Sequence, residues 1–191
     1  MFFIEVGTSD FDTNEQLIKN GWSGMQVEPV KHYFDKLPKY SNIIYENVAI
    51  SDKNGTSTMN FISPDKLEQM DSDHQWMKGI GSLEGKSGPM SFNDNRDYFE
   101  SLGVIKQDVQ TCTLDYLCQK HNISHVDYLK IDTEGHDLKV LKSINLKLIN
   151  VKQIKIEYKH LSENDVHEVI SILKENNYII YIETDDIYAI R

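Results

Sequence analysis

The densest group of chemically active side chains in this sequence follows one short apolar run. Asp132, Glu134, His136 and Asp137 come directly after residues 126–131. Carboxylates and an imidazole in this setting can orient a substrate hydroxyl group or take its proton. Two other roles stay open for the same group. The last three residues can satisfy free N–H groups at the start of a helix, and the first three can bind a divalent metal ion.

A second candidate proton acceptor is His160, which follows the apolar run at residues 151–158. The unperturbed pKa of histidine lies near neutrality, which suits a general base. The alternative role for His160 is that of an ordinary hydrogen-bonding residue at a strand end.

Gly7 and Glu28 occupy positions at which parallel α/β sheets bind ligands. Gly7 ends an apolar run and lets the backbone approach a ligand, while the helix expected after it presents free N–H groups to an anion. Glu28 lies 21 residues later, at the end of the next predicted strand, where a carboxylate can accept both hydroxyls of a ribose. Ser9 and Phe11 stand where a dinucleotide fingerprint has glycines. A nucleoside cofactor with one carboxylate, such as S-adenosylmethionine, is therefore favoured over a dinucleotide.

The elements that must position these residues alternate between strands and helices, which predicts a largely parallel sheet with helices on both faces. A tight turn at Asp185 and Asp186 requires the last strand to run antiparallel. Thr13 and Gln16 predict a capping box for the first helix. Strands are expected over residues 2–6, 24–28, 42–50, 56–62, 126–131, 151–158, 178–183 and 187–190, and helices over 13–19, 30–37, 113–122, 137–144 and 165–176.

Residues 63–108 lack clear periodicity and hold five of the ten glycines of the chain. Trp76, Met77, Met90 and Phe92 make this stretch too apolar for a simple linker. We predict a single domain over residues 1–191, with a Gly-rich insertion or lid at about 63–108 that partly folds onto the site.

The composition excludes several classes of function. The 191 residues carry a formal net charge of -10, which argues against unaided binding to nucleic acids or to anionic membranes. No apolar run approaches the roughly 20 residues of a membrane span, and the first residues do not form a secretory signal. Cys112 and Cys118 are too few for a disulfide framework, so we expect reduced thiols in a cytoplasmic protein.

Taken in chain order, the motifs resemble those of the FkbM family of S-adenosylmethionine-dependent methyltransferases. The strongest element is Asp-Tyr-Leu-Lys-Ile-Asp-Thr-Glu-Gly at residues 127–135. Weaker supporting elements lie at residues 26–29, 47–52, 113–115 and 156–157. The resemblance implies a Rossmann-like, seven-stranded methyltransferase sheet, mostly parallel with an antiparallel C-terminal strand. It also implies O-methylation of a hydroxyl group on a small-molecule acceptor, commonly a sugar or natural product.

The resemblance assigns the cofactor site residue by residue. Glu5 and Gly7 match the acidic-x-Gly of the cofactor loop, Glu28 matches the ribose-binding acid, and residues 47–49 match the stretch that lines the adenine. At Phe11 the chain departs from the family, which has a glycine there, and this side chain would crowd a backbone close to the methionine moiety. The full expected cofactor site is Glu5, Gly7, Thr8, Ser9, Asp10, Glu28, Pro29, Asn47, Val48 and Ala49.

The sequence therefore predicts an S-adenosylmethionine-dependent O-methyltransferase. Asp132, Glu134 or His160 would take the proton of the acceptor hydroxyl, and residues 79–88 would close over the acceptor. Two alternatives stay open: a module that binds S-adenosylmethionine without turnover, and a metal-dependent hydrolase that uses the cluster at 132–137. Neither the acceptor nor the oligomeric state is specified by the sequence.

Overall fold

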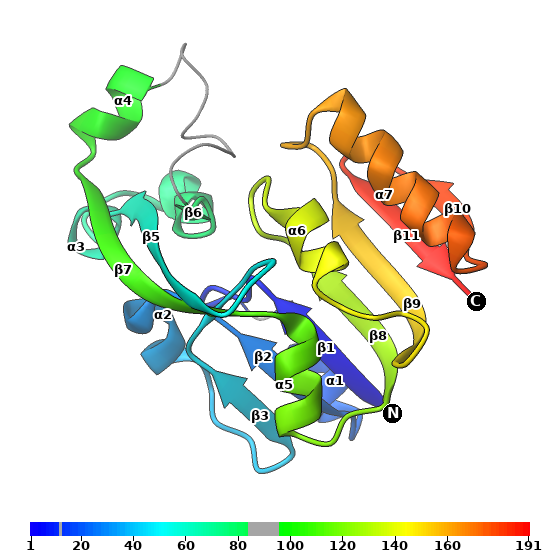
Figure 1. Cartoon of the computed structure of the whole chain (residues 1–191). Helices are drawn as coiled ribbons and strands as arrows, with labels where there is room; N and C mark the ends of the chain where they lie inside the picture. The colour runs from blue at the N-terminus through cyan, green and yellow to red at the C-terminus, as the bar shows by residue number, and fades with distance from the viewer. Residues whose placement is uncertain (12, 84–95) are drawn as a thin grey trace.

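The computed structural model describes residues 1–11, 13–83 and 96–191 of the chain. Its centre is a seven-stranded sheet with the strand order β10-β11-β9-β8-β1-β2-β3 (Figure 1). The central pairs are parallel, and β11 runs antiparallel to both of its neighbours, as predicted. The strands are β1 (Phe2–Val6), β2 (Ser23–Val27), β3 (Ile43–Glu46), β8 (His125–Ile131), β9 (Asn150–Glu157), β10 (Ile179–Ile182) and β11 (Asp186–Ile190).

Helices cover both faces of this sheet, which confirms the predicted fold class. On one face, the core is formed by side chains from α5, α6 and α7. On the other face, Ile18 of α1 packs against Phe3 and Ile43. The helices around the sheet are α1 (Glu15–Lys19), α2 (Lys31–Lys36), α5 (Leu114–Lys120), α6 (Asp137–Lys142) and α7 (Glu163–Glu175).

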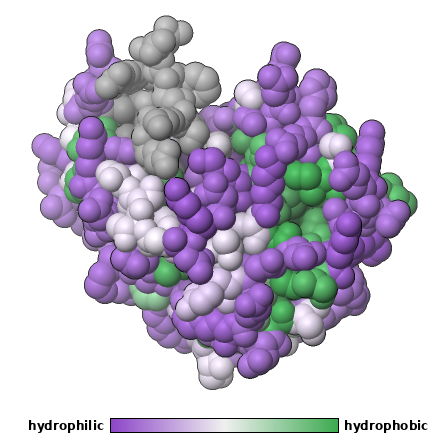
Figure 2. All heavy atoms as spheres, viewed as in Figure 1, coloured by the Kyte–Doolittle hydropathy of each residue, from purple (hydrophilic) through white to green (hydrophobic). Residues whose placement is uncertain are grey.

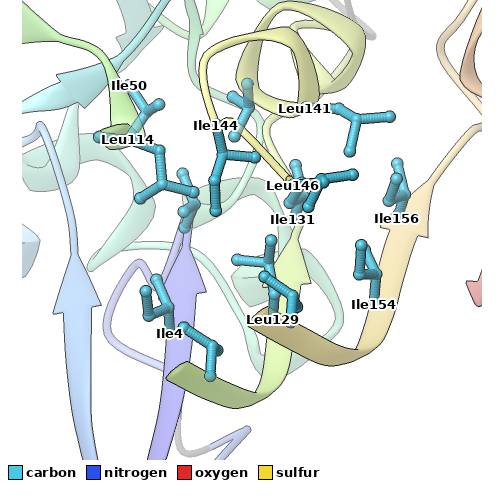
Figure 3. Packing of buried hydrophobic residues seen from close by; sticks show 14 of the residues in the cluster. Ile4, Ile50, Leu114, Leu129, Ile131, Leu141, Ile144, Leu146, Ile154 and Ile156 are labelled. Carbon is cyan, nitrogen blue, oxygen red and sulfur yellow. The ribbon is translucent and has the colours of Figure 1, made fainter. Parts of the chain in front are cut away.

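The main core forms because alternate residues of each strand point to the same face. Ile4, Leu129 and Ile154 are register partners on β1, β8 and β9, and all three are fully or almost fully buried (Figure 3). Leu114 of α5 and Leu141 of α6 belong to the same buried cluster. The residues between these apolar positions therefore face the α1 side of the sheet.

A second sheet of four strands, with the order β4-β7-β5-β6, lies beside the carboxyl ends of β1 and β2 (Figure 1). Strand β5 pairs antiparallel with β7 along its whole length, from Gly55 opposite Thr111 to Ile62 opposite Val104. This unit contains β4 (Ala49–Ile50), β5 (Gly55–Ile62), α3 (Pro64–Leu67), the 3-10 helix η1 (Ser72–Lys78), β6 (Ser82–Leu83), α4 (Arg96–Ser101) and β7 (Val104–Cys112).

Three local predictions are wrong. The strand expected over residues 42–50 is divided between β3 and β4, which belong to different sheets. The insertion predicted over residues 63–108 includes the first half of β7, because three of residues 105–108 are polar and show no apolar alternation. In the structure these residues are exposed strand residues. The capping box at Thr13 is absent: the N-cap of α1 is Asn14, whose side chain makes no capping hydrogen bond.

The surface of the face shown in Figure 2 is mostly hydrophilic, with a band of hydrophobic residues in the region of α6 and α7. None of the helices in the described part of the chain has the length and apolar character that a membrane crossing needs. Cys112 and Cys118 are buried free thiols.

Candidate active site

A cavity of about 270 Å³ opens at the carboxyl ends of β1, β2 and β8. This is the edge at which parallel α/β sheets bind ligands. One wall comes from the loops of the seven-stranded sheet, and the other comes from the second sheet and η1. The second wall includes Met59, Trp76, Lys78, Gly79, Gly81 and Leu83. The residues after β5 therefore lie over the predicted site, although residues 84–88 of the expected closing segment fall outside the described residues.

Gly7 lines the cavity at the point where the chain leaves β1. Its φ is +85°, and a Cβ atom added to it would lie only 1.8 Å from the carbonyl oxygen of Asp132. A side chain is therefore excluded at Gly7 by the backbone that follows β8.

Glu28 is the central acidic group of the cofactor prediction, and it lines the cavity with only 4% of its surface exposed. Its Oε2 accepts a hydrogen bond from the backbone N–H of Ser9 at 2.7 Å, and its Oε1 accepts one from the N–H of Val30 at 2.8 Å. Burial raises the pKa of Glu28 to about 7, and the two N–H groups partly oppose this increase. Each carboxylate oxygen has a second lone pair, so the group can also accept hydrogen bonds from a ligand.

The other residues expected around the cofactor divide into two groups. Pro29, Val48 and Ala49 line the cavity. Asn47 has a supporting role: its Nδ2 donates hydrogen bonds to the carbonyl oxygens of Glu28 and Pro29, at 2.7 and 3.0 Å. Asn47 therefore fixes the turn that carries Glu28.

The loop after Gly7 connects the two walls. Ser9 lines the cavity in a left-handed conformation with φ 50°, and Thr8 is buried beside it. Asp10 forms an ion pair with Lys78 of η1 at 3.3 Å. Phe11 also lines the cavity, and its ring lies against Gly79, where an added Cβ would be 3.3 Å from the ring. The loop and η1 are thus held together beside the cavity.

Glu5 lies below the cavity and does not line it. Its carboxylate is fully buried, accepts a hydrogen bond from Gln26 at 3.2 Å and lies 3.4 Å from Nζ of Lys130. Lys130 also reaches Asp132, whose Oδ2 lies 3.1 Å from the same nitrogen. Lys130 and Asp132 both line the cavity. A buried ammonium group therefore connects Glu5 to the acidic group at the cavity wall.

Glu134 connects the acidic segment that follows β8 with His160, which follows β9. It lines the cavity with a positive φ of 54°, and its Oε2 lies 3.2 Å from Nε2 of His160. Burial, followed by repulsion from Glu157 and other carboxylates, raises the pKa of Glu134 to about 9. Burial lowers the pKa of His160. His160 itself does not line the cavity, so it reaches the cavity through Glu134.

The structure confirms the predicted capping role for Asp137 and corrects it for Glu134 and His136. Asp137, not Glu134, satisfies backbone N–H groups: its carboxylate accepts hydrogen bonds from Thr133 at 2.8 Å and Gly135 at 2.9 Å, and burial raises its pKa to about 6. His136 is the N-cap residue of α6, but its side chain makes no capping bond.

The expected set of metal ligands is also different. Nε2 of His136 lies 3.0 Å from Oγ of Ser51. Within residues 1–11, 13–83 and 96–191, the group of ligand atoms close enough for a metal ion is formed by Glu134, Glu157 and His160, within 4.8 Å of one another. The metal alternative built on Asp132, Glu134 and His136 is therefore wrong in its ligands.

The sequence predicts that residues 79–88 close over the site, but it assigns no role to Lys130 or to Met59 of the second wall. Lys130 belongs to the most distinctive motif, but a lysine within an apolar strand gives no sign of its partners. Trp76 and Met59 line the cavity from elements whose order in space depends on the β5–β7 pairing. The apolar residues around Trp76 are the sequence signal that this segment packs against another part of the protein.

The strand order, the antiparallel β11 and the cavity at the carboxyl edge together define a Rossmann-like fold of the methyltransferase class. The sequence matches the methyltransferase FkbM domain over residues 5–180, and the chain belongs to this family, as its motifs predicted. Among solved structures, a chain of a fibrillarin/Nop5p complex is similar with a TM-score of 0.42 and 13% identity, over 98% of this chain and 70% of that chain. No curated protein matches the sequence.

Proposed function

We propose that this protein is an S-adenosylmethionine-dependent O-methyltransferase that methylates a hydroxyl group of a sugar or another small natural product. The observation that carries the proposal is the placement of Gly7 and the buried Glu28 carboxylate on one cavity. Membership of the FkbM methyltransferase family supports the same reaction class.

The residues on the β1–β2 side of the cavity fit this cofactor. Gly7 lines the cavity where the chain leaves β1, and Glu28 retains lone pairs for two ribose hydroxyls. Pro29, Val48 and Ala49 provide an apolar surface for the adenine. The cofactor supplies an electrophilic methyl group on a positively charged sulfur.

Side chains on the β8 side of the cavity support the binding and deprotonation of an acceptor. Asp132 and Glu134 line the cavity and can bind a hydroxyl group. At neutral pH the Glu134 carboxyl group is protonated, because its pKa is raised to about 9. As Glu134 takes the proton of the hydroxyl, it can pass its own proton to Nε2 of His160, 3.2 Å away. The proton of the hydroxyl group thus leaves the cavity, and Glu134 does not become a buried negative charge.

Binding and turnover test this proposal separately. Calorimetric titration of the wild-type protein with S-adenosylmethionine and S-adenosylhomocysteine should show binding of both. Glu28→Ala should weaken both about 10- to 100-fold, since two hydrogen bonds to a buried carboxylate are lost. Glu46→Ala is the matched control, because Glu46 ends the neighbouring strand β3 and pairs with Lys120 at 2.6 Å outside the cavity. Absence of binding in the wild-type protein would refute the proposed function.

One alternative function is binding of the cofactor without methyl transfer. Phe11 lines the cavity where the family has a glycine, which favours a module that binds S-adenosylmethionine without turnover. Transfer of a labelled methyl group to a panel of hydroxylated sugars and polyketides separates the two functions. Transfer to any of these acceptors that depends on Glu134 supports the methyltransferase.

A further inference from the structure

A row of polar side chains crosses the α1 side of the seven-stranded sheet just below the cavity. Gln26, Glu5, Lys130 and Lys155 are successive register partners on β2, β1, β8 and β9. Register partners in parallel strands point to the same face, so the row is continuous. Lys130 is the member that also lines the cavity.

Lys130 is held between two carboxylates with little access to water. Its Nζ lies 3.4 Å from Oε1 of Glu5 and 3.1 Å from Oδ2 of Asp132, and 7% of its side chain is exposed. Burial acts to lower the pKa of Lys130, but the Asp132 and Glu5 carboxylates outweigh burial and raise it. Lys130 therefore stays charged.

The two carboxylates differ in what they face. The Glu5 side chain is fully buried, whereas 36% of the Asp132 side chain is exposed and this residue lines the cavity. Lys130 thus cancels a charge in the interior and holds the other carboxylate in one place. Charged hydrogen bonds of this kind are strong enough to fix the orientation of a side chain.

We propose that Lys130 is a positioning residue: it fixes the Asp132 carboxylate at the cavity wall, where its negative charge faces the positively charged sulfur of the methyl donor. This inference rests on the proposed function. The Lys-Ile-Asp segment at 130–132 thereby distinguishes the methyl donor from its demethylated product, because the two compounds differ by one positive charge. The contact favours binding of the donor and release of the product after transfer.

The proposal is tested by the ratio of the dissociation constants for S-adenosylhomocysteine and S-adenosylmethionine. Lys130→Met should lower this preference for the donor about ten-fold. If Lys130 acted only through its charge, the substitution would have the opposite effect. With one positive charge fewer near the cavity, the preference for the positively charged donor would rise. The ratio is therefore sensitive to the position of Asp132 and not only to the net charge.

Two further variants control for folding and for the loss of a lysine. Glu5→Gln combined with Lys130→Met removes the buried charge pair together, which avoids an unpaired buried carboxylate. This double variant should fold and should show the same lost preference. Lys155→Met is the matched control, because Lys155 is the register partner of Lys130 and pairs with Asp186 at 2.9 Å, away from the cavity. Its preference should stay within about two-fold of the wild-type value.

Each of three other outcomes would contradict the positioning role of Lys130, and one of them would also contradict the proposed function. If the preference is retained or rises in both Lys130 variants, the positioning role is wrong while the proposed function stands. If both ligands weaken equally, Lys130 is a direct ligand of the carboxylate that the two compounds share, and the positioning role is again wrong. If the wild-type protein binds neither compound, the proposed function fails and the positioning role fails with it.

Discussion

Oε2 of Glu134 lies 3.2 Å from Nε2 of His160, and the two side chains are only 14% and 9% exposed. Burial moves their pKa values in opposite directions: it raises that of Glu134 and lowers that of His160. At neutral pH, the carboxyl group therefore holds a proton and the imidazole is able to accept one. The pair combines a residue at the cavity wall with a proton acceptor behind it.

Glu134→Gln should abolish most of the methyl transfer while it leaves cofactor binding intact. The amide can still bind a hydroxyl group, but it cannot exchange a proton with His160, so kcat should fall about 100-fold. Steady-state kinetics and calorimetry of the same preparation measure the two effects. Glu168→Gln, on the exposed side of α7 and paired with Lys142 at 2.6 Å, is the control. Unchanged kcat in Glu134→Gln would remove Glu134 from the proton path.

The course of the main sheet could be predicted from the sequence because its signals are local. The β8 strand and the acidic segment after it are an apolar run followed by charges and a glycine, and the final turn at Asp185 determines the direction of β11. The second sheet could not be predicted in the same way. It depends on pairing between β5 and β7, which are far apart in the sequence, and half of β7 is exposed and polar.

In the candidate site, too, the positions set by local signals could be predicted, whereas the contacts between distant residues could not. Gly7 and Glu28 follow strands directly, so their position at the carboxyl edge follows from the fold class, and both line the cavity. The contact between Glu134 and His160 joins the ends of two strands through side-chain directions that no spacing specifies. Lys130 was missed for the related reason that its partners are Glu5, on another strand, and Asp132.

The stability of the ligand-free protein should fall as the pH rises from about 5 to 9. Burial raises the pKa of Glu28 to about 7, of Glu157 to about 8 and of Glu134 to about 9. Carboxyl groups with raised pKa values bind more protons in the folded state than in the unfolded state above pH 4.5, so raising the pH favours unfolding. The stability associated with these protons is fully present below pH 4.5 and is lost as the pH passes through the folded-state values.

Urea unfolding at pH 5.5 and pH 8.5 measures this loss. Glu134→Gln removes the group with the highest of the three values, so it should reduce the difference between the two pH values by on the order of 1–3 kcal/mol. Glu168→Gln should leave the difference unchanged. A wild-type protein that becomes more stable between pH 5.5 and pH 8.5 would contradict the buried, protonated state of these carboxyl groups.

Cys112 and Cys118 should not react with thiol reagents in the native protein. Both are almost fully buried, and burial raises their pKa values to about 11 and about 12, so little thiolate is present at pH 8. Labelling with Ellman's reagent should be limited by unfolding and should become rapid in urea. Rapid reaction of one thiol per chain without denaturant would show that one of the two sites opens in the native state.

Gly7→Ala and Gly21→Ala should separate the cost of a backbone conformation from the cost of a blocked contact. Both glycines have positive φ values, +85° and +83°, so alanine is strained at each position. An added Cβ at Gly21 has nothing within 4 Å, and Gly21→Ala should cost only about 1 kcal/mol. An added Cβ at Gly7 lies 1.8 Å from the carbonyl oxygen of Asp132, which is backbone and cannot rotate away. Gly7→Ala should therefore cost at least about 3 kcal/mol in chemical denaturation and should displace β1 from β8 at the cavity. Equal costs for the two substitutions would mean that the two strand ends are not in contact, and the cavity would then lose the geometry on which cofactor binding depends.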